Sequence, residues 1–134
     1  MKTLVFDPIR KKRVVLTPEE GVRQQLITLL HKNLGYPVNL MSCEYSISIN
    51  GFKYRGDLVL LNKDLKPLLL AECKAPSVKI TRDTFEQVLR YNMALNVKYI
   101  LLTNGETTYF ASYDNSLNNY QYLTEIPSYN ELSE

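Results

Sequence analysis

Residues 52–76 read FKYRGDLVLLNKDLKPLLLAECKAP and contain two strand-like runs joined by a turn. Residues 58–61 end the first run, residues 62–64 are typical of a turn, and residues 68–71 begin the second run. Nearly continuous apolar runs of this length indicate strands that are covered on both faces of a sheet. The stretch therefore predicts two neighbouring antiparallel strands at the centre of a sheet.

The sequence on either side of this stretch predicts the remaining elements. Thr17-Pro18-Glu19-Glu20 supplies an N-cap, a proline at the first helical position and a glutamate that closes a capping box, so a helix begins here. Residues 41–49 alternate apolar and polar side chains, and Asn50-Gly51 is a strong hairpin signal. The predicted order is a helix, three antiparallel strands, a helix and two strands, over residues 17–34, 41–49, 52–61, 68–74, 81–95, 97–103 and 107–111.

Composition and charge limit the classes of protein that the chain can represent. With 134 residues, 45% of them hydrophobic and 22% charged, it has the composition of one globular domain. Residues 1–112 hold all sixteen basic residues and ten acidic ones, a net charge of +6, whereas residues 113–134 hold four acidic residues, the last being Glu134. We therefore expect a basic domain over 1–112 and an acidic tail over 113–134 that packs on the same domain.

Cysteine and histidine usage excludes two kinds of site. Cys43, Cys73 and His31 are the only residues of these types, too few for a disulfide framework or a zinc cluster. This usage indicates a reducing, cytoplasmic setting. The apolar residues before Asp7 are too few for a signal peptide, and no stretch is long enough to span a bilayer, so we expect no membrane association.

Three charged residues, Asp57, Glu72 and Lys74, border the apolar runs of the two central strands. Glu72 and Lys74 are two apart on one strand and share a face, whereas Cys73 faces the opposite side. One interpretation is a surface ion pair at the end of the strand. The other requires a register that brings Asp57 beside Glu72, which would create a carboxylate pair able to hold Mg²⁺ with an ammonium group beside it.

In the spacing of these charged residues, the sequence resembles the PD-(D/E)XK nucleases. Asp57 and Glu72-Cys73-Lys74 are similar to their D…(D/E)xK signature, and Gln87 with Tyr91 is similar to the QxxxY motif of their RecB-type branch. The resemblance implies an α/β fold with a restriction-endonuclease-like αβββαβ core, in which helices flank both faces of a mixed sheet.

The resemblance extends to the first helix. Glu19 with Arg23 is similar to an E-x-x-x-R pattern in which the acidic residue assists metal binding. A helical wheel places Glu19 toward the core beside Val22, and places Glu20, engaged in the capping box, away from the core. The alternative role for Glu19 is to complement the helix dipole.

A wider set of motifs resembles the N-terminal nuclease domain of type I restriction enzyme R subunits, in a short, free-standing form. The set covers about residues 5–110 and includes Phe6-Asp7-Pro8, Gly56-Asp57 and Thr103-Asn104-Gly105. Gly56 stands where the signature has proline, and the chain has no G-x-x-x-x-G-K-[ST] phosphate loop. The resemblance thus implies DNA as the substrate, separate motor, methyltransferase or specificity subunits as partners, and a homodimer for cutting both strands.

The same resemblance implies a function and a set of site residues. The function is that of a metal-dependent DNA endonuclease, a hydrolase that cleaves phosphodiester bonds with Mg²⁺ or Mn²⁺. The competing hypothesis is a catalytically inactive module of this fold that binds DNA or a restriction or repair partner protein. The implied metal ligands are Asp57, Glu72, the backbone carbonyl of Cys73 and Glu19, and the implied catalytic residues are Asp57, Glu72, Lys74, Gln87 and Tyr91.

Basic residues outside the motifs are candidate DNA contacts. The run at residues 10–13 suits either phosphate contacts or a solvated surface. Arg55 shares a strand face with Asp57 and suits a phosphate or a carboxylate partner equally. The candidates are Arg10, Lys11, Lys12, Arg55, Lys79 and Arg82.

Overall fold

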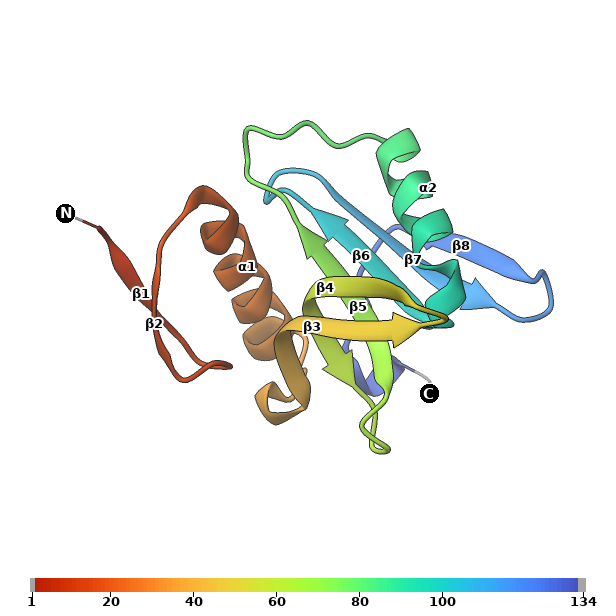
Figure 1. Cartoon of the computed structure of the whole chain (residues 1–134), viewed down its shortest axis with the longest axis horizontal. Helices are drawn as coiled ribbons and strands as arrows, with labels where there is room; N and C mark the ends of the chain where they lie inside the picture. Colours follow the sequence, from red (N-terminus) through yellow and green to blue (C-terminus); the bar gives the residue numbers. More distant parts are fainter. Residues whose placement is uncertain (1, 133–134) are drawn as a thin grey trace.

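A six-stranded mixed sheet forms the centre of the molecule. In the computed structural model, which describes residues 2–132, its strands lie side by side in sequence order (Figure 1). All neighbouring strands are antiparallel except β5 and β6, which are parallel. The strands are β3 (Met41–Ile49), β4 (Phe52–Leu61), β5 (Pro67–Cys73), β6 (Tyr99–Thr103), β7 (Thr108–Asp114) and β8 (Asn119–Leu123).

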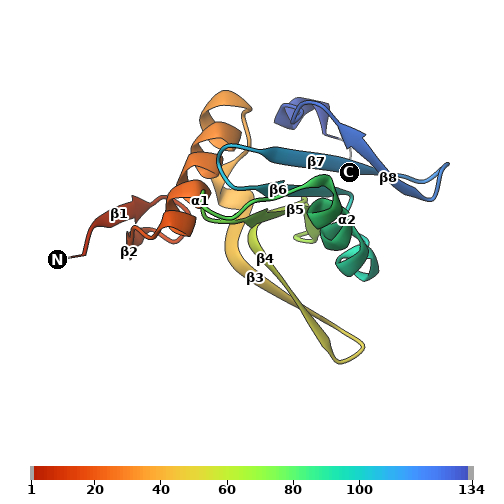
Figure 2. The same ribbon diagram turned by 90° about the horizontal axis from the view of Figure 1, so that it is seen from above.

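Two helices cover opposite faces of this sheet (Figure 2). Side chains from alternate positions of β5 and β6, such as Leu69 and Leu101, pack with Leu26 of α1 (Pro18–Thr28), while Leu70 and Ile100 pack on the other face against α2 (Arg82–Tyr91). The mixed sheet with helices on both faces is the arrangement expected from the sequence. The order α1, β3, β4, β5, α2, β6 also agrees with the predicted succession of elements.

Helix ends follow the capping signals in the sequence. Thr17 caps α1, since its Oγ1 accepts a hydrogen bond from the Glu20 N–H at 3.1 Å. The α-helix ends at Thr28, continues as a π-helical turn over Leu29–Asn33, and stops at Gly35, whose φ of +76° is the left-handed conformation that glycine adopts most easily. The predicted helix over 17–34 is therefore present with a changed final turn. The second helix is shorter than its predicted range of 81–95, because a 3₁₀ turn replaces its last residues.

Three strands were not predicted from the sequence. β1 (Leu4–Asp7) and β2 (Lys12–Val15) form a separate hairpin beside α1, which we call the N-terminal hairpin. In the tail, where the periodicity is weak, β8 pairs with β7 through residues such as Tyr120, so the sheet gains a sixth strand. Glu134, counted among the acidic residues of the tail, lies outside the described residues. No helix within residues 2–132 is long and apolar enough to cross a membrane.

Candidate functional site

A cavity opens where β4 and β5 separate. The ladder between these strands ends at the pair Leu58↔Ala71, whereas the ladder of β5 with β6 continues to Cys73↔Thr103. Toward its turn, the β3–β4 hairpin curves away from the sheet (Figure 2). The resulting cavity has a volume of about 460 Å³ and is lined by residues of α1, β3, β4, β5 and α2.

Asp57 bridges the two separating strands at this point. Its Oδ2 accepts a hydrogen bond from the backbone N–H of Cys73 at 2.7 Å. The ladder between the strands ends one residue short of Asp57, at Leu58↔Ala71, so this side-chain hydrogen bond continues the connection between β4 and β5. Asp57, Glu72 and Lys74 line the same cavity, so the structure brings the three predicted residues together although Asp57 and Glu72 are not a paired position of the ladder.

The electrostatics of the cavity centre on Glu72. Burial raises the pKa of the Glu72 carboxyl, Lys74 opposes this increase, and the charges of Asp57 and Glu19 raise the pKa further. A cation placed beside Glu72 would favour its ionised form. Burial also raises the pKa of the Cys73 thiol to about 12, so at neutral pH the thiol is protonated and unsuited to act as a nucleophile.

The two glutamates of α1 have exchanged the environments predicted by the helical wheel. The Glu20 side chain is buried, at 8% exposure, whereas that of Glu19 is 48% exposed. The wheel fails because Arg10, from the N-terminal hairpin, reaches the helix and donates a hydrogen bond to Glu20 Oε1 at 2.7 Å, which compensates the buried charge. The Glu20 N–H donates to the Thr17 cap, but the Glu20 carboxylate binds Arg10, so it does not close the capping box predicted from the sequence. Glu19, though exposed, still lines the cavity.

Sequence reasoning assigned no site role to Glu44 and did not anticipate the burial of Arg23. Both line the cavity, and Arg23 Nη1 lies 3.6 Å from a carboxylate oxygen of Glu44. The signal in the sequence was weak: Glu44 is the only charged residue on a strand face whose other members are serines. Its backbone φ of +55°, rare for a residue with a side chain, became visible only in three dimensions.

The two residues of the QxxxY motif differ in position. Tyr91, at the end of α2, lines the cavity, donates a hydrogen bond to the Lys53 carbonyl at 3.1 Å and packs against the ring of Tyr54. Gln87, one turn earlier, is exposed and does not line the cavity. The structure thus brings Tyr91, but not Gln87, to the cluster around Asp57.

The predicted DNA contacts also separate into two groups. Arg55 lines the cavity, and Arg10 lines a groove of about 550 Å³ next to it, between the N-terminal hairpin and α1. Arg82 instead pairs with Glu86 at 3.6 Å and lies over the ring of Tyr122. The remaining candidates are exposed on the hairpin or on the loop after β5, namely Lys11, Lys12 and Lys79.

The sequence also matches a family model. Residues 18–127 match the model described as type I restriction enzyme R protein N terminus. The chain belongs to this family. The resemblance to R-subunit N termini that the sequence indicated is therefore confirmed. Among curated proteins, no sequence matches the chain.

A solved structure supports the R-protein N-terminal fold. The fragment of a type I restriction enzyme subunit described as HsdR, from Vibrio vulnificus YJ016, matches with a TM-score of 0.60 and 21% sequence identity. The match covers 87% of this chain and 24% of that structure. This chain thus spans about a quarter of the length of the HsdR fragment.

The oxygen donors of this R-protein N-terminal domain fit a hydrated hard cation. Within the described residues, no three His, Cys, Asp or Glu side chains form a group that could hold a metal ion by themselves. The cavity instead presents the carboxylates of Asp57 and Glu72 beside the backbone of Cys73. Mg²⁺ typically binds one or two carboxylates and retains several waters, so this set suits Mg²⁺ and lacks the ligands of a structural zinc site.

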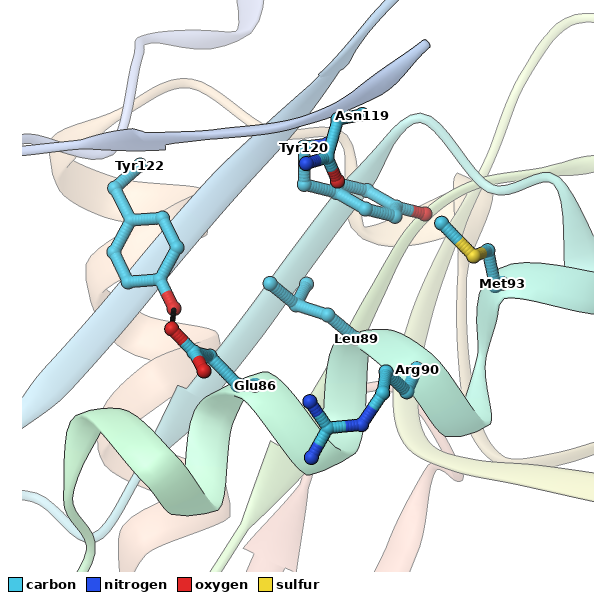
Figure 3. A pocket seen from close by; sticks show the side chains of 7 residues that line it. All are labelled: Glu86, Leu89, Arg90, Met93, Asn119, Tyr120 and Tyr122. Carbon is cyan, nitrogen blue, oxygen red and sulfur yellow. Dashed lines mark hydrogen bonds between the residues drawn. The ribbon is translucent and has the colours of Figure 1, made fainter.

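A second cavity of the R-protein N-terminal domain lies between α2 and β8 (Figure 3) and has a volume of about 330 Å³. Glu86 is the only carboxylate among the seven residues that line it, and it accepts a hydrogen bond from the Tyr122 hydroxyl at 3.3 Å. The Tyr120 hydroxyl is bonded to the Val97 carbonyl at 2.6 Å. The side chains of Glu86, Tyr120 and Tyr122 thus bind each other or the backbone, and we assign no chemistry to this cavity.

Proposed function

We propose that this chain is a metal-dependent DNA endonuclease domain of the PD-(D/E)XK type. The observation that carries the proposal is the convergence of Asp57, Glu72 and Lys74 on one cavity where β4 and β5 separate. A carboxylate pair with an adjacent ammonium group provides the ligands and the charge that phosphodiester hydrolysis requires. Membership of a restriction-enzyme family supports a nuclease-like role in a restriction system.

Asp57, Glu72 and the Cys73 carbonyl would hold Mg²⁺ or Mn²⁺, with Glu19 assisting through a water or a second ion. When bound, the ion would polarise the scissile phosphate and lower the pKa of a water. Asp57 is held in position by the Cys73 N–H, which leaves its other oxygen available to a ligand. The raised pKa of Glu72 means that its ionised form is disfavoured in the free protein. A bound cation would favour that form.

The other cavity residues would position water and substrate. Lys74 lies at the end of β5, where its backbone N–H donates to the Thr103 carbonyl at 2.9 Å, so its main chain is fixed beside Glu72. Its ammonium group would orient the attacking water and stabilise the charge that develops on the phosphate. Tyr91 would orient Lys74 or the DNA backbone, and Gln87 would act only if α2 or the substrate shifts toward it.

DNA, as the proposed substrate, would be bound partly by this domain and partly by other chains. The net charge of +2 is small for a protein that binds DNA alone. Separate motor, methyltransferase or specificity subunits would supply affinity and target choice, and a homodimer would supply the second active site that cutting both strands requires.

The test of this proposal is Mg²⁺-dependent nicking of a supercoiled plasmid by wild-type protein and by Lys74→Ala. We expect the wild type to nick the plasmid and Lys74→Ala to lose the activity by at least about 100-fold, because a positioned charge in the transition state contributes on that scale. Lys63→Ala, which removes an exposed lysine from the turn at the opposite end of β5, is the matched control. Equal nicking by Lys74→Ala and Lys63→Ala would refute the assignment.

The competing function, an inactive module that binds DNA or a partner protein, is favoured by one observation: no three acidic, cysteine or histidine side chains among the described residues form a metal-holding group. A metal titration separates the two functions. If neither Mg²⁺ nor Mn²⁺ raises the melting temperature of the wild type or supports nicking, the binding function replaces the endonuclease.

A further inference from the structure

Arg23 has hydrogen-bonding capacity that the rest of the protein does not use. Its side chain is 6% exposed, yet its Nε and Nη1 are buried without a hydrogen-bond partner among the described residues. The nearest carboxylates, from Glu19, Glu20 and Glu44, lie 3.6–3.8 Å from its nitrogens. These separations exceed the roughly 2.7–2.9 Å of a tight charge-assisted hydrogen bond. Since buried donors are normally satisfied, Arg23 is available to a further acceptor.

The carboxylate of Glu44 lies among three guanidinium groups and binds none of them tightly. Its oxygens are 3.4 Å from Arg55, 3.6 Å from Arg23 and 4.0 Å from Arg10. The three arginines come from β4, α1 and the N-terminal hairpin. Three cations from separate elements thus converge on one small anionic group, which is the arrangement of an anion-binding site.

The backbone of Glu44 is strained at this one residue. Its φ is +55°, although β3 and β4 pair in the same register on both sides, at Cys43↔Leu58 and Tyr45↔Gly56. A left-handed residue inside an otherwise regular strand is costly unless Gly or Asn occupies the position. Strain of this kind is concentrated at ligand-binding and switch positions. β3 is therefore distorted at Glu44, the residue whose carboxylate lies near the three guanidinium groups.

Arg23 and Glu44 also lie where two cavities meet. Together with Glu19 they line both the cavity that contains Asp57 and the groove between α1 and the N-terminal hairpin. An anion held by Arg23 would be close to the carboxylate pair and at the entrance of the groove that Arg10 lines. Because the cavity and the groove are adjacent, a polyanion with one charge per unit could occupy both, whereas a single small anion could occupy only one of them.

We propose that Arg23 and Arg55 form a binding site for one phosphate of the DNA backbone, and that the Glu44 carboxylate occupies this site in the free protein until DNA displaces it. A phosphodiester presents two anionic oxygens, which match the forked donors of arginine. The proposal rests on the proposed function only in taking DNA as the ligand. It adds a subsite that lies outside the carboxylate and lysine cluster, and a side chain that competes with the substrate.

The test compares Glu44→Gln with Glu86→Gln in their binding of a short DNA duplex, measured by fluorescence anisotropy in EDTA at fixed salt. Both variants remove one negative charge from a side chain of similar exposure, 47% for Glu44 and 42% for Glu86, and both residues pair with arginine. Only Glu44 lies at the proposed site. We expect Glu44→Gln to bind DNA about tenfold more tightly than the wild type, equivalent to about 1.4 kcal/mol, and Glu86→Gln to change affinity less than twofold.

The increase in DNA affinity caused by Glu44→Gln must also depend on the arginines of the proposed site. Arg55 is exposed enough to be replaced safely, so Glu44→Gln is measured again in an Arg55→Gln background, where we expect most of the gain to disappear. Circular dichroism and thermal melting establish that each variant is folded. A Glu44→Gln affinity no higher than that of Glu86→Gln, or a gain that Arg55→Gln leaves intact, would overturn the phosphate site.

The outcome is separable from that of the endonuclease test. Binding is measured without a divalent ion, so loss of the proposed catalytic activity does not affect it. If nicking depends on Lys74 but Glu44→Gln does not bind DNA more tightly, only the phosphate site is refuted. If Glu44→Gln binds DNA more tightly but the wild type does not nick the plasmid, only the endonuclease is refuted.

Discussion

Buried charge at Asp7 fixes the N-terminal hairpin to the rest of the molecule. Asp7 is fully buried, and its carboxylate accepts hydrogen bonds from the backbone N–H groups of Ile9 and Arg10, and from the Arg10 side chain. Arg10 in turn binds Glu20 of α1. Burial alone would raise the pKa of Asp7, but the hydrogen bonds and the charge of Arg10 outweigh it, and the pKa lies below its ordinary value of 3.8. The hairpin is therefore held in place by a carboxylate that must stay ionised.

We expect Asp7→Asn to destabilise the protein by about 2–3 kcal/mol at pH 7, because Arg10 loses one of its two buried counter-charges, the other being Glu20. A lowered pKa in the folded state means that the stabilisation is present above pH 3.8 and is lost as the pH falls through the folded-state pKa. The difference between wild type and variant should therefore be constant from pH 7 to about pH 5 and shrink below pH 3.8. Urea unfolding at several pH values measures it.

Asp64→Asn, at an exposed turn between β4 and β5, is the control for Asp7→Asn and should change stability by less than about 0.5 kcal/mol. A difference between wild type and Asp7→Asn that persists undiminished at pH 3 would show that the asparagine disturbs packing, and that the charge of Asp7 is not the cause.

At the scale of elements, the packing of β4 against β5 leaves no room for a side chain at Gly56, the residue before Asp57. A Cβ on Gly56 would lie 2.8 Å from Val59 Cγ2 and 2.9 Å from Leu70 Cγ, closer than carbon atoms approach. Gly56, which stands where the nuclease signature has proline, is thus required in this chain by packing, although it holds no ligand. Substitution of Gly56 should therefore be tolerated poorly, although Gly56 is not a proposed metal ligand.

Gly56→Ala is expected to destabilise the fold by about 1–3 kcal/mol through overpacking. The matched control is Gly21→Ala in α1, where the added Cβ would meet only Leu16 at 3.8 Å, an ordinary contact. Alanine at a helical position costs less entropy than glycine, so this control should be neutral or stabilising by up to about 1 kcal/mol. Guanidinium unfolding of both variants gives the comparison, and equal effects would contradict the close contact at Gly56.

Local patterns predicted the elements whose conformation is fixed by nearby residues. The alternation over 41–49 and the Asn50-Gly51 turn gave the bounds of β3 and the start of β4, since the turn residues themselves adopt the positive φ values that a tight hairpin needs. β8 and the N-terminal hairpin escaped prediction because their short strands depend on partners elsewhere in the chain: β8 on β7, and the hairpin on Glu20.

The same distinction applies to the candidate site. Asp57, Glu72 and Lys74 were identified because they border apolar runs, a contrast that is visible in the sequence. The environments of Glu20, Arg23 and Glu44 are determined by contacts between the hairpin, α1 and β3, which no sequence spacing encodes. The sequence therefore pointed to the proposed metal ligands and to Arg10 and Arg55 as separate candidate DNA contacts, but not to the convergence of these arginines with Arg23 on Glu44.

At the scale of the whole molecule, basic residues gather on the N-terminal hairpin. The hairpin and β8 lie on opposite sides of the sheet (Figure 1), and the acidic tail returns after β8 to the end of the first helix, where the Tyr129 N–H donates to the Leu34 carbonyl at 2.8 Å. The hairpin presents exposed Lys11 and Lys12, and the groove beside it shares Glu19, Arg23 and Glu44 with the cavity. A small net charge thus conceals a basic end from which a DNA backbone would reach the proposed site.

The double variant Lys11→Ala/Lys12→Ala tests whether DNA follows this route. If each lysine neutralises one phosphate, the slope of log K against log salt concentration should become shallower by about 1.8, because each contact releases about 0.9 counterion from duplex DNA. Nicking at saturating DNA should be unchanged, since neither residue lines the cavity. Lys63→Ala/Lys66→Ala, which removes two exposed lysines from the β4–β5 turn, should leave the slope unchanged. An identical slope in the two double variants would mean that the hairpin lysines face solvent in the complex, and that DNA approaches the cavity from another side.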